Sequence, residues 1–312
     1  MPKVSVIIPS YNRGNVIAKT LNSFLNQTFS DFEIIVVDNN STDNTKEIVR
    51  GIADPRIKYV LEKRQGVHWA RNRGALEAYS NILYFTDDDM EADRNLLEEI
   101  IKVFDIDSSI GAVTGIILPR FEIDPPEWVI KHCYNAIYGI NIQKGLIVSE
   151  NDIGVFSGHE AVKKDILIKA GGFNPENIKG EWVGDGETGF NKNIKKLGYK
   201  FAFTDKSITY HLIPKERLTQ KFLNLRMANQ GNADSYTYYR EKKKTDSFIK
   251  HILKGCYFLS LAIWFRLIGN SEWRLRWAWV YYWIARIKYD FKLSRSRKWR
   301  ELVLKTNWIS EI

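Results

Sequence analysis

The stretch that decides the fold is Asn81-Ile82-Leu83-Tyr84-Phe85-Thr86-Asp87-Asp88-Asp89. A short apolar run here leads directly into three aspartates, and an apolar run that ends at polar residues is typical of a buried strand. Two upstream segments repeat the pattern: residues 4–8 lead into Pro9-Ser10-Tyr11-Asn12, and residues 32–37 lead into Asp38-Asn39-Asn40-Ser41-Thr42. Because ligands bind beyond the carboxyl ends of the strands in an open α/β sheet, the three polar ends predict one shared ligand site.

Strand-like and helix-like segments alternate, which predicts the α/β class with a mostly parallel central sheet covered by helices. The expected strands are residues 4–8, 32–37, 56–60, 81–86, 111–118 and 199–204. The expected helices are residues 16–26, 42–50, 69–78, 96–104, 162–170 and 188–197, and residues 119–145 are expected to form loops with a short helix. The pattern after Leu218 is helical, with residues 236–244 as an exposed polar stretch between helices. We therefore expect an α/β domain at residues 1–215 and a basic, aromatic-rich helical region at residues 216–312.

The positive charge of the chain is concentrated toward its C-terminal end. The net charge is +9, but residues 240–312 hold 17 Lys or Arg against 6 Asp or Glu, together with seven of the ten tryptophans. Such a segment suits an anionic membrane surface or nucleic acid. The cysteines, Cys133 and Cys256, lie far apart and suggest neither a disulfide framework nor a thiolate zinc site. Because the N-terminus does not resemble a signal peptide, we expect a cytoplasmic protein.

The three adjacent carboxylates predict a metal site. They repel one another unless a cation or strong hydrogen-bond donors compensate, and hard oxygen ligands favour Mg²⁺ or Mn²⁺. A metal held by Asp89 would neutralise a diphosphate, while Tyr11 and Asp38 would grip a base and a ribose. The alternative is an acidic surface turn that leads into a helix, where negative charge stabilises by about 0.3 to 1 kcal/mol.

Four motifs follow one another along the first half of the chain. They are Val6-Ile7-Ile8-Pro9-Ser10-Tyr11-Asn12, the run from Val36 to Thr45, Gly66 with Ala70-Arg71-Asn72-Arg73-Gly74, and Phe85-Thr86-Asp87-Asp88-Asp89. In this order they resemble the signatures of family 2 glycosyltransferases with the GT-A fold. The resemblance covers about residues 3–212 and not the C-terminal region.

The resemblance implies a set of donor-binding residues. They are Pro9, Ser10, Tyr11, Asn12, Asp38, Arg71, Asp87 and Asp88. Pro9, Tyr11 and Asp38 would contact the nucleotide base, and Asp87 and Asp89 would form a DXD pair in which Asp89 is the direct metal ligand. The chain departs from the family at Asp38-Asn39, where the family often has two acidic residues.

Two carboxylates, Asp185 and Glu187, stand in a glycine-containing loop before a helix. An inverting sugar transfer needs one such group to take the proton of the acceptor hydroxyl. The loop resembles the family's Glu-Asp catalytic motif, although the order of its residues differs. Glu187 has the usual position of the base when it is counted back from Gly198-Tyr199-Lys200, and Asp185 is the alternative. The resemblance also supports His211, which follows a strand-like run, as a metal ligand opposite Asp89.

The C-terminal region reads as an amphipathic helix followed by an aromatic one. Apolar residues recur at helical spacing at Phe248, Ile252, Cys256, Leu259, Ile263 and Leu267. Aromatic residues and arginines follow between Leu275 and Ile287, a mixture that settles at the headgroup boundary of a membrane. We expect residues 246–300 to meet a membrane surface. The alternative is a helical subdomain that packs on the α/β domain and leaves a solvated basic face.

The sequence therefore favours an inverting, metal-dependent glycosyltransferase. It would use a nucleoside-diphosphate sugar, UDP-linked, with Mn²⁺ or Mg²⁺, and a sugar or lipid-linked acceptor in cell-surface polysaccharide or glycolipid synthesis. It would act at the cytoplasmic face of the membrane as a peripheral protein. One rival is a Mg²⁺-dependent nucleotidyltransferase, for which no basic glycine-rich triphosphate loop is visible. The other is a basic protein that binds nucleic acid, a partner that we do not expect.

Overall fold

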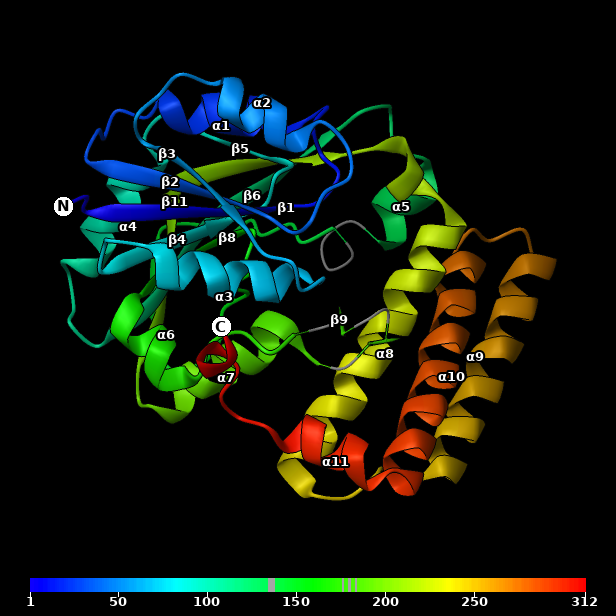
Figure 1. Cartoon of the computed structure of the whole chain (residues 1–312). Coiled ribbons are helices and arrows are strands. Elements are labelled where there is room, and N and C mark those ends of the chain that lie inside the picture. Colours follow the sequence, from blue (N-terminus) through cyan, green and yellow to red (C-terminus); the bar gives the residue numbers. More distant parts are fainter. Residues whose placement is uncertain (134–137, 176, 179–180, 183) are drawn as a thin grey trace.

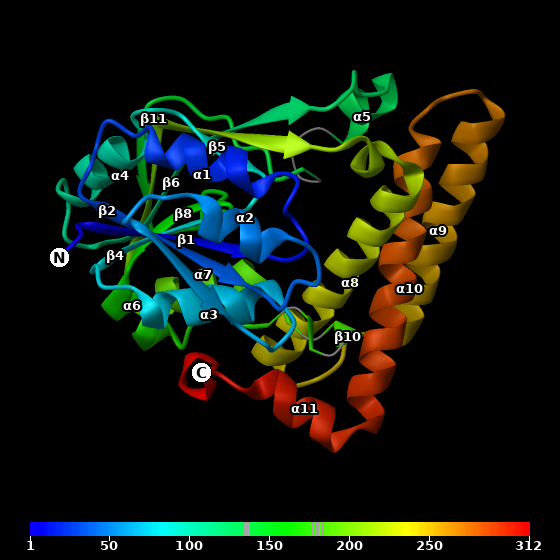
Figure 2. The same ribbon diagram turned by 45° about the horizontal axis from the view of Figure 1, so that its top comes forward.

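The computed structural model describes residues 1–133, 138–175, 177–178, 181–182 and 184–312. An α/β unit and a helical segment lie side by side (Figure 1). The helical segment stands at the end of the sheet to which the arrowheads of β1 and β11 point (Figure 2). The carboxyl ends of these strands therefore face helices from the last third of the chain.

Among the described residues, nine strands form the central sheet, in the order β3-β2-β1-β4-β8-β6-β11-β5, with β7 paired to β11. Their bounds are β1 Val4–Ser10, β2 Phe32–Asp38, β3 Ile57–Leu61, β4 Ile82–Thr86, β5 Met90–Ala92, β6 Ile110–Phe121, β7 Leu146–Ser149, β8 His159–Lys163 and β11 Lys200–Ile213. The strands β3, β2, β1, β4, β6 and β11 run in one direction, and β8, β5 and β7 run against them. A small sheet pairs β9 (Asn177–Ile178) with β10 (Glu181–Trp182). The predicted α/β class with a mostly parallel sheet is confirmed.

Strand β1 shows how the sequence builds both faces of the sheet. Val4, Val6 and Ile8 pack into one core with α1 (Ile17–Leu25), α2 (Thr45–Gly51) and α4 (Leu96–Phe104). Ile7 packs into a second core with α3 (Val67–Glu77), α6 (Lys164–Ala170) and α7 (Gly186–Lys196). Successive side chains of a strand point to opposite faces, so a strand covered on both faces reads as a continuous apolar run. Figure 1 shows α1 and α2 above the sheet and α3, α6 and α7 below it.

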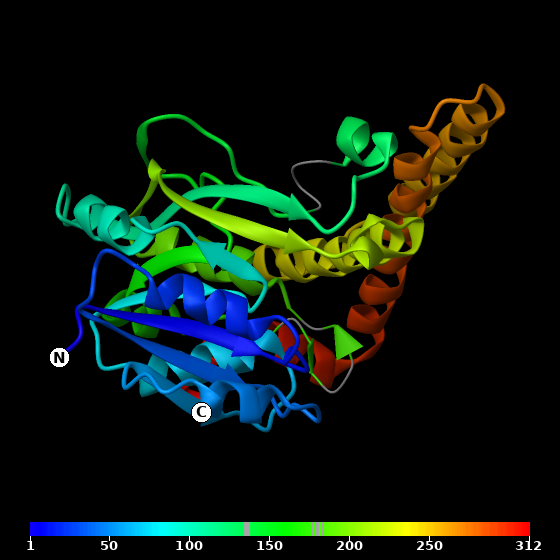
Figure 3. The ribbon, with the colours of Figure 1, turned by 90° about the horizontal axis from the view of Figure 1, so that it is seen from above.

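The helical segment consists of α8 (Gln220–Lys242), α9 (Phe248–Leu267), α10 (Trp273–Arg295) and α11 (Arg297–Leu304), preceded by the short turn η1 (Lys215–Leu218). Helix α8 lies against the α/β unit and packs on α10, and α9 lies on the far side of α10 (Figure 3). Leu223 and Met227 of α8 share a core with Tyr282 and Trp283 of α10. The helical region that the sequence predicts is confirmed.

The end of the chain returns to the α/β unit. The indole of Trp308 is almost fully buried, and its backbone N–H donates to the carbonyl oxygen of Gly171 at 2.9 Å. Ile309, in the short turn η2 (Ile309–Glu311), joins the core beside α6 and α7. The division at residue 215 stays a prediction, but these last residues pack on the first unit.

Several predicted elements need correction. Residues 236–244 were expected between helices, but α8 continues to Lys242 and Tyr236 is fully buried, because its ring packs against α10 and α11. Residues 162–170 were expected to be one helix, but β8 runs to Lys163 and α6 begins at Lys164. The strand expected at 199–204 extends to Ile213. The short helix expected within 119–145 is α5 (Glu127–His132), and residues 134–137 of that stretch lie outside the described residues.

Candidate active site

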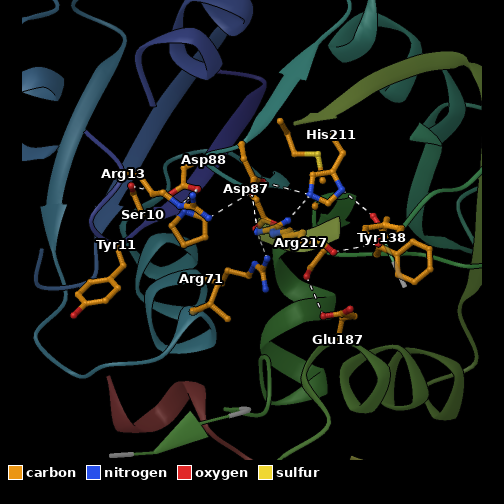
Figure 4. Close-up of a pocket in the computed structure, with 18 of the residues that line it drawn as sticks. Ser10, Tyr11, Arg13, Arg71, Asp87, Asp88, Tyr138, Glu187, His211 and Arg217 are labelled. Atoms are coloured by element: carbon orange, nitrogen blue, oxygen red, sulfur yellow. Dashed lines mark hydrogen bonds and ion pairs between the residues drawn. The ribbon is translucent and has the colours of Figure 1, made fainter. Parts of the chain in front are cut away.

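A cleft of about 870 Å³ opens where the carboxyl ends of β1 and β4 face the helical segment. Its walls come from the residues after β1, the aspartate run after β4, His211 of β11, Glu187 of α7 and residues of α8 (Figure 4). The predicted residues that line it are Pro9, Ser10, Tyr11, Arg71, Asp87, Asp88, Asp89, Glu187 and His211. Residues from five separate parts of the chain therefore meet in one cleft.

An arginine faces each of the three aspartates. Asp87 accepts a hydrogen bond from Arg71 at 2.5 Å. Asp88 lies 3.5 Å from the guanidinium of Arg13, and Asp89 accepts a hydrogen bond from Arg217 at 3.0 Å. The aspartate run alone therefore does not require a metal, since these cations compensate its charge. These three pairings could not be predicted from the sequence, because the arginines come from distant parts of the chain.

Asp88 ties the ends of β1 and β4 together. Its carboxylate accepts a hydrogen bond from the Ser10 hydroxyl at 2.8 Å, and its backbone oxygen accepts one from the Thr20 hydroxyl at 2.8 Å. Burial, together with the neighbouring charge of Asp89, raises the pKa of Asp88 to about 7. Asp88 is therefore only partly ionised at neutral pH, and Asp87 is the most exposed carboxylate of the run.

Asp89 and His211 are the pair that fits a divalent metal. The antiparallel pairing of β11 with β5 sets His211 opposite Met90, and the Nε2 atom of His211 lies 3.9 Å from Oδ1 of Asp89. The Nδ1 atom lies 2.8 Å from the carbonyl oxygen of Tyr138, which can only accept, so Nδ1 carries the proton and Nε2 carries the lone pair. A histidine that ligates a metal usually donates its other N–H to such a carbonyl.

The protein offers a small ligand set at this pair. Among the described residues, no group of three His, Cys, Asp or Glu side chains is arranged to hold a metal ion. A carboxylate oxygen and an imidazole nitrogen nevertheless suit Mn²⁺ or Mg²⁺ when a diphosphate and water supply the remaining ligands. Burial lowers the pKa of His211, which keeps the imidazole neutral, so that Nε2 retains a lone pair.

The two candidate bases lie in different environments. Glu187 lines the cleft, and its carboxylate accepts a hydrogen bond from the Ser157 hydroxyl at 3.1 Å (Figure 4). Asp185 is buried behind the cleft, where it accepts hydrogen bonds from the Asn174 amide at 2.8 Å and the Thr237 hydroxyl at 2.7 Å. Burial raises the pKa of Asp185. Asp185 therefore joins α7 to α8, and Glu187 is the carboxylate that a substrate can reach.

Two of the residues predicted to bind the donor shape the loop instead of lining the cleft. The buried carboxylate of Asp38 accepts hydrogen bonds from the Ser41 backbone N–H at 2.8 Å and the Tyr59 hydroxyl at 2.6 Å. The amide oxygen of Asn12 accepts one from the Thr42 N–H at 2.8 Å. Their predicted contact with a nucleotide stays a prediction. Tyr11, by contrast, lines the cleft and is 47% exposed, which leaves its ring free to stack on a base.

Sequence reasoning missed part of the lining. The additional residues include Arg13, Asn39, Gln65, Tyr138, Ser157, Arg217, Phe222, Leu225, Arg226 and Asn229. Arg13 directly follows a motif and carried a usable signal. Residues from α8 carried none, because their place in the cleft depends on how the helical segment packs against the sheet.

Comparisons with known proteins agree with this geometry. A family model described as glycosyl transferase family 2 matches residues 5–169. The glycosyltransferase AglE of Haloferax volcanii is 30% identical over 219 residues, which cover 68% of this chain and 67% of AglE. The solved mannosyltransferase PcManGT of Pyrobaculum calidifontis, in complex with GDP-Man and Mn²⁺, has a TM-score of 0.58 at 22% identity and covers 97% of this chain and 83% of its own. The fold is that of the GT-A glycosyltransferases.

The chain belongs to glycosyl transferase family 2. The resemblance found in the sequence is thus confirmed. A further relative, the GalNAc(5)-diNAcBac-PP-undecaprenol beta-1,3-glucosyltransferase of Campylobacter jejuni, is 44% identical over 95 residues. That match spans 29% of this chain and only 31% of the relative. Family membership does not favour the nucleotidyltransferase or the nucleic-acid-binding alternative.

Proposed function

We propose that the protein transfers a sugar from a UDP-linked donor to an acceptor hydroxyl with inversion, in the synthesis of a cell-surface polysaccharide or glycolipid. One observation carries the proposal: the carboxylate of Glu187 and the aspartate run lie in the same cleft, at the carboxyl ends of the sheet's strands. This is where α/β enzymes bind their ligands. Family membership supplies the reaction class.

The donor would lie along the first half of the cleft. The base would stack on Tyr11 beside Pro9 and Ser10, and the diphosphate would reach Arg13 and Arg71. Asp89 and His211 would hold Mn²⁺ or Mg²⁺, which when bound neutralises charge on the leaving diphosphate. Arginines next to a diphosphate favour the departure of the nucleotide because they stabilise the charge that develops on it.

Glu187 would act as the general base. The acceptor oxygen forms a bond to the anomeric carbon on the face opposite the diphosphate, and the bond from that carbon to the diphosphate oxygen breaks. The leaving nucleoside diphosphate takes the electron pair, and the acceptor's proton passes to a carboxylate oxygen of Glu187. The hydrogen bond from Ser157 holds this carboxylate at the edge of the cleft.

The acceptor would enter on the side of the cleft that α8 forms. Phe222, Leu225, Arg226 and Asn229 of α8 line this side of the cleft together with Tyr138. Apolar side chains beside an arginine suit an acceptor that carries a phosphate and an apolar chain. The name of the Campylobacter jejuni relative contains such a compound, a sugar linked to undecaprenol through a diphosphate.

Helix α9 would place the enzyme at an anionic membrane surface. By length and composition, α9 is the one helix among the described residues that is long and apolar enough to cross a membrane. Its side chains facing away from α10 include Ile249, Leu253, Trp264 and Leu267, which are 72, 65, 58 and 77% exposed. They follow one another at spacings of 4, 11 and 3 residues, each close to a whole number of helical turns, so they form one apolar stripe.

The flanks of this stripe favour lipid over a protein partner. Lys250, Lys254 and Arg266 border it, and α9 contains no acidic residue. Each basic residue near an anionic surface contributes about 1 kcal/mol of binding free energy. A second copy of the chain would set these cations against one another, because the same surface would face itself.

Sedimentation with lipid vesicles tests the membrane surface. We expect the protein to pellet with vesicles that contain phosphatidylglycerol, and less with pure phosphatidylcholine. Replacing both Leu253 and Trp264 by Glu should leave the protein in the supernatant, whereas Ile168→Glu, at an exposed apolar position of α6, should change nothing. Unchanged pelleting of the double variant would contradict the assignment. If the wild type were a dimer and the double variant a monomer that still pellets, the stripe would instead be an interface between two copies.

The reaction itself is tested by measuring nucleoside diphosphate released from a panel of UDP- and GDP-linked sugars. Sugars linked to polyprenyl diphosphate serve as acceptors, with Mn²⁺ or with EDTA. We expect release from a UDP-linked sugar that requires both the metal and the acceptor. Release of pyrophosphate from a nucleoside triphosphate, with none from any sugar nucleotide, would instead identify a nucleotidyltransferase.

A further inference from the structure

Arg217 bridges the two candidate metal ligands. Its Nη2 atom donates to Oδ2 of Asp89 at 3.0 Å, and its Nη1 atom donates to Nε2 of His211 at 2.8 Å. Arg217 belongs to η1, the turn that joins β11 to α8. A single guanidinium therefore neutralises Asp89 and occupies the lone pair of His211 at the same time. Figure 4 shows Arg217 beside His211.

His211 cannot hold this arginine and a metal together. A neutral imidazole has one N–H and one lone pair. The carbonyl oxygen of Tyr138 takes the N–H of Nδ1, so the single lone pair of Nε2 accepts from Arg217. A metal bound at Nε2 needs that same lone pair. The Nε2 atom of His211 can therefore bind either Arg217 or a metal, but not both at once.

We propose that Arg217 is an internal counter-ion that competes with the divalent metal for Asp89 and His211 and leaves the pair when the metal binds. The inference rests on the proposed function, because that function supplies the metal. Arg13 does not take this role. Its Nη2 atom lies 3.7 Å from Oδ2 of Asp89, and within the described part of the chain its guanidinium makes no hydrogen bond with His211.

The competition links the metal to the donor. Without a donor, the metal must break both hydrogen bonds of Arg217, so its affinity is low. A bound diphosphate adds ligands for the metal and, in the same cleft, an anion for the displaced guanidinium. Each ligand therefore raises the affinity for the other, as thermodynamic linkage requires. Because Arg217 lies in η1, a movement of Arg217 would also move the start of α8, which lines the acceptor side of the cleft.

The test is a titration of the protein with Mn²⁺ alone, followed by the electron paramagnetic resonance signal of free hydrated Mn²⁺. Arg217→Ala should bind Mn²⁺ at least about tenfold more tightly than the wild type, because a charge-assisted hydrogen bond no longer has to be broken. Arg226→Ala removes a cation from the same cleft that, among the described residues, makes no hydrogen bond or ion pair with Asp89 or His211, and it should shift the affinity much less. Adding Asp89→Asn to Arg217→Ala should abolish the gain.

A gain in affinity is diagnostic, because damage to the fold lowers metal affinity. Equal or weaker Mn²⁺ binding by Arg217→Ala, an equal gain in Arg226→Ala, or a gain that survives Asp89→Asn would overturn the proposal. Failure of the proposed function is seen separately: neither UDP nor GDP would then strengthen Mn²⁺ binding by the wild type. The titration with Mn²⁺ alone tests the competition between Arg217 and the metal whether or not the proposed function is right.

Discussion

The imidazole Nε2 of His211 lies 3.9 Å from the carboxylate Oδ1 of Asp89, although one residue is in β11 and the other follows β4. A backbone hydrogen bond holds the two residues at this distance, because the Leu212 N–H donates to the carbonyl oxygen of Asp89 at 2.8 Å. The register of β11 beside β5 thus assembles the candidate metal ligands, and a shift of one residue would turn His211 to the opposite face of the sheet.

Replacing the two candidate bases should have different consequences. Glu187→Gln should keep donor binding and lower kcat by about 100-fold or more, because the amide cannot take the acceptor's proton. Asp185→Asn should lower the free energy of unfolding by about 1 to 3 kcal/mol, because an amide offers one acceptor oxygen where the carboxylate offers two, so the hydrogen bonds donated by the Asn174 amide and the Thr237 hydroxyl cannot both be kept. Turnover per folded molecule and chemical denaturation measure the two effects. A loss of turnover in Asp185→Asn at unchanged stability would reverse the assignment.

The sequence was sufficient for the parts of the site that lie within short motifs. The strand ends at Pro9 to Tyr11 and at Asp87 to Asp89 could be identified because apolar runs lead into polar residues, and Glu187 could be identified by counting back from Gly198-Tyr199-Lys200. The arginines opposite the aspartates could not be paired in advance, since ion pairing between distant residues depends on tertiary packing. Asp38 and Asn12 were expected at the ligand, but turn-forming polar residues serve local hydrogen bonds equally well.

The same limit applies to the fold. Alternation of apolar runs predicted the sheet of the first half, where β1, β2 and β4 are buried along most of their length. It failed at residues 236–244, where a polar sequence hides Tyr236 and Tyr239 that pack against Tyr289 and Trp299. The return of Trp308 to Gly171 is a contact between distant residues that no local pattern encodes.

The packing of α8 against α10 should be sensitive to one glycine. A Cβ added at Gly231 would lie 2.4 Å from the carbonyl oxygen of Tyr282, so Gly231→Ala should destabilise the protein by roughly 1 to 3 kcal/mol. Gly255 in α9 is the matched control, because a Cβ there would lie 3.6 Å from Cβ of Trp283. Gly255→Ala should be neutral or stabilising by up to about 1 kcal/mol through helix propensity. Thermal or urea denaturation of both variants makes the comparison, and equal effects would refute the close approach.

The buried imidazole of His159 should make stability depend on pH. Burial lowers its pKa from 6.5 to about 4, and its Nδ1 atom accepts a hydrogen bond from the Tyr84 hydroxyl at 2.6 Å. The unfolded chain therefore binds a proton between these values that the folded protein does not. This contribution is complete above pH 6.5 and is lost as the pH falls through about 4, a change of roughly 3 kcal/mol. Urea denaturation from pH 7 to 4 should show a smaller loss for His159→Gln, and an identical pH slope would rule out the shifted pKa.

The central claim is that Asp89 and His211 hold a divalent metal together with the diphosphate of a nucleotide. The most direct measurement is the shift in melting temperature on addition of UDP or GDP, with and without Mn²⁺, for the wild type and Asp89→Asn. We predict a shift for the wild type that needs both nucleotide and metal, and none for Asp89→Asn beyond that of nucleotide alone. A full metal-dependent shift in Asp89→Asn would contradict the claim.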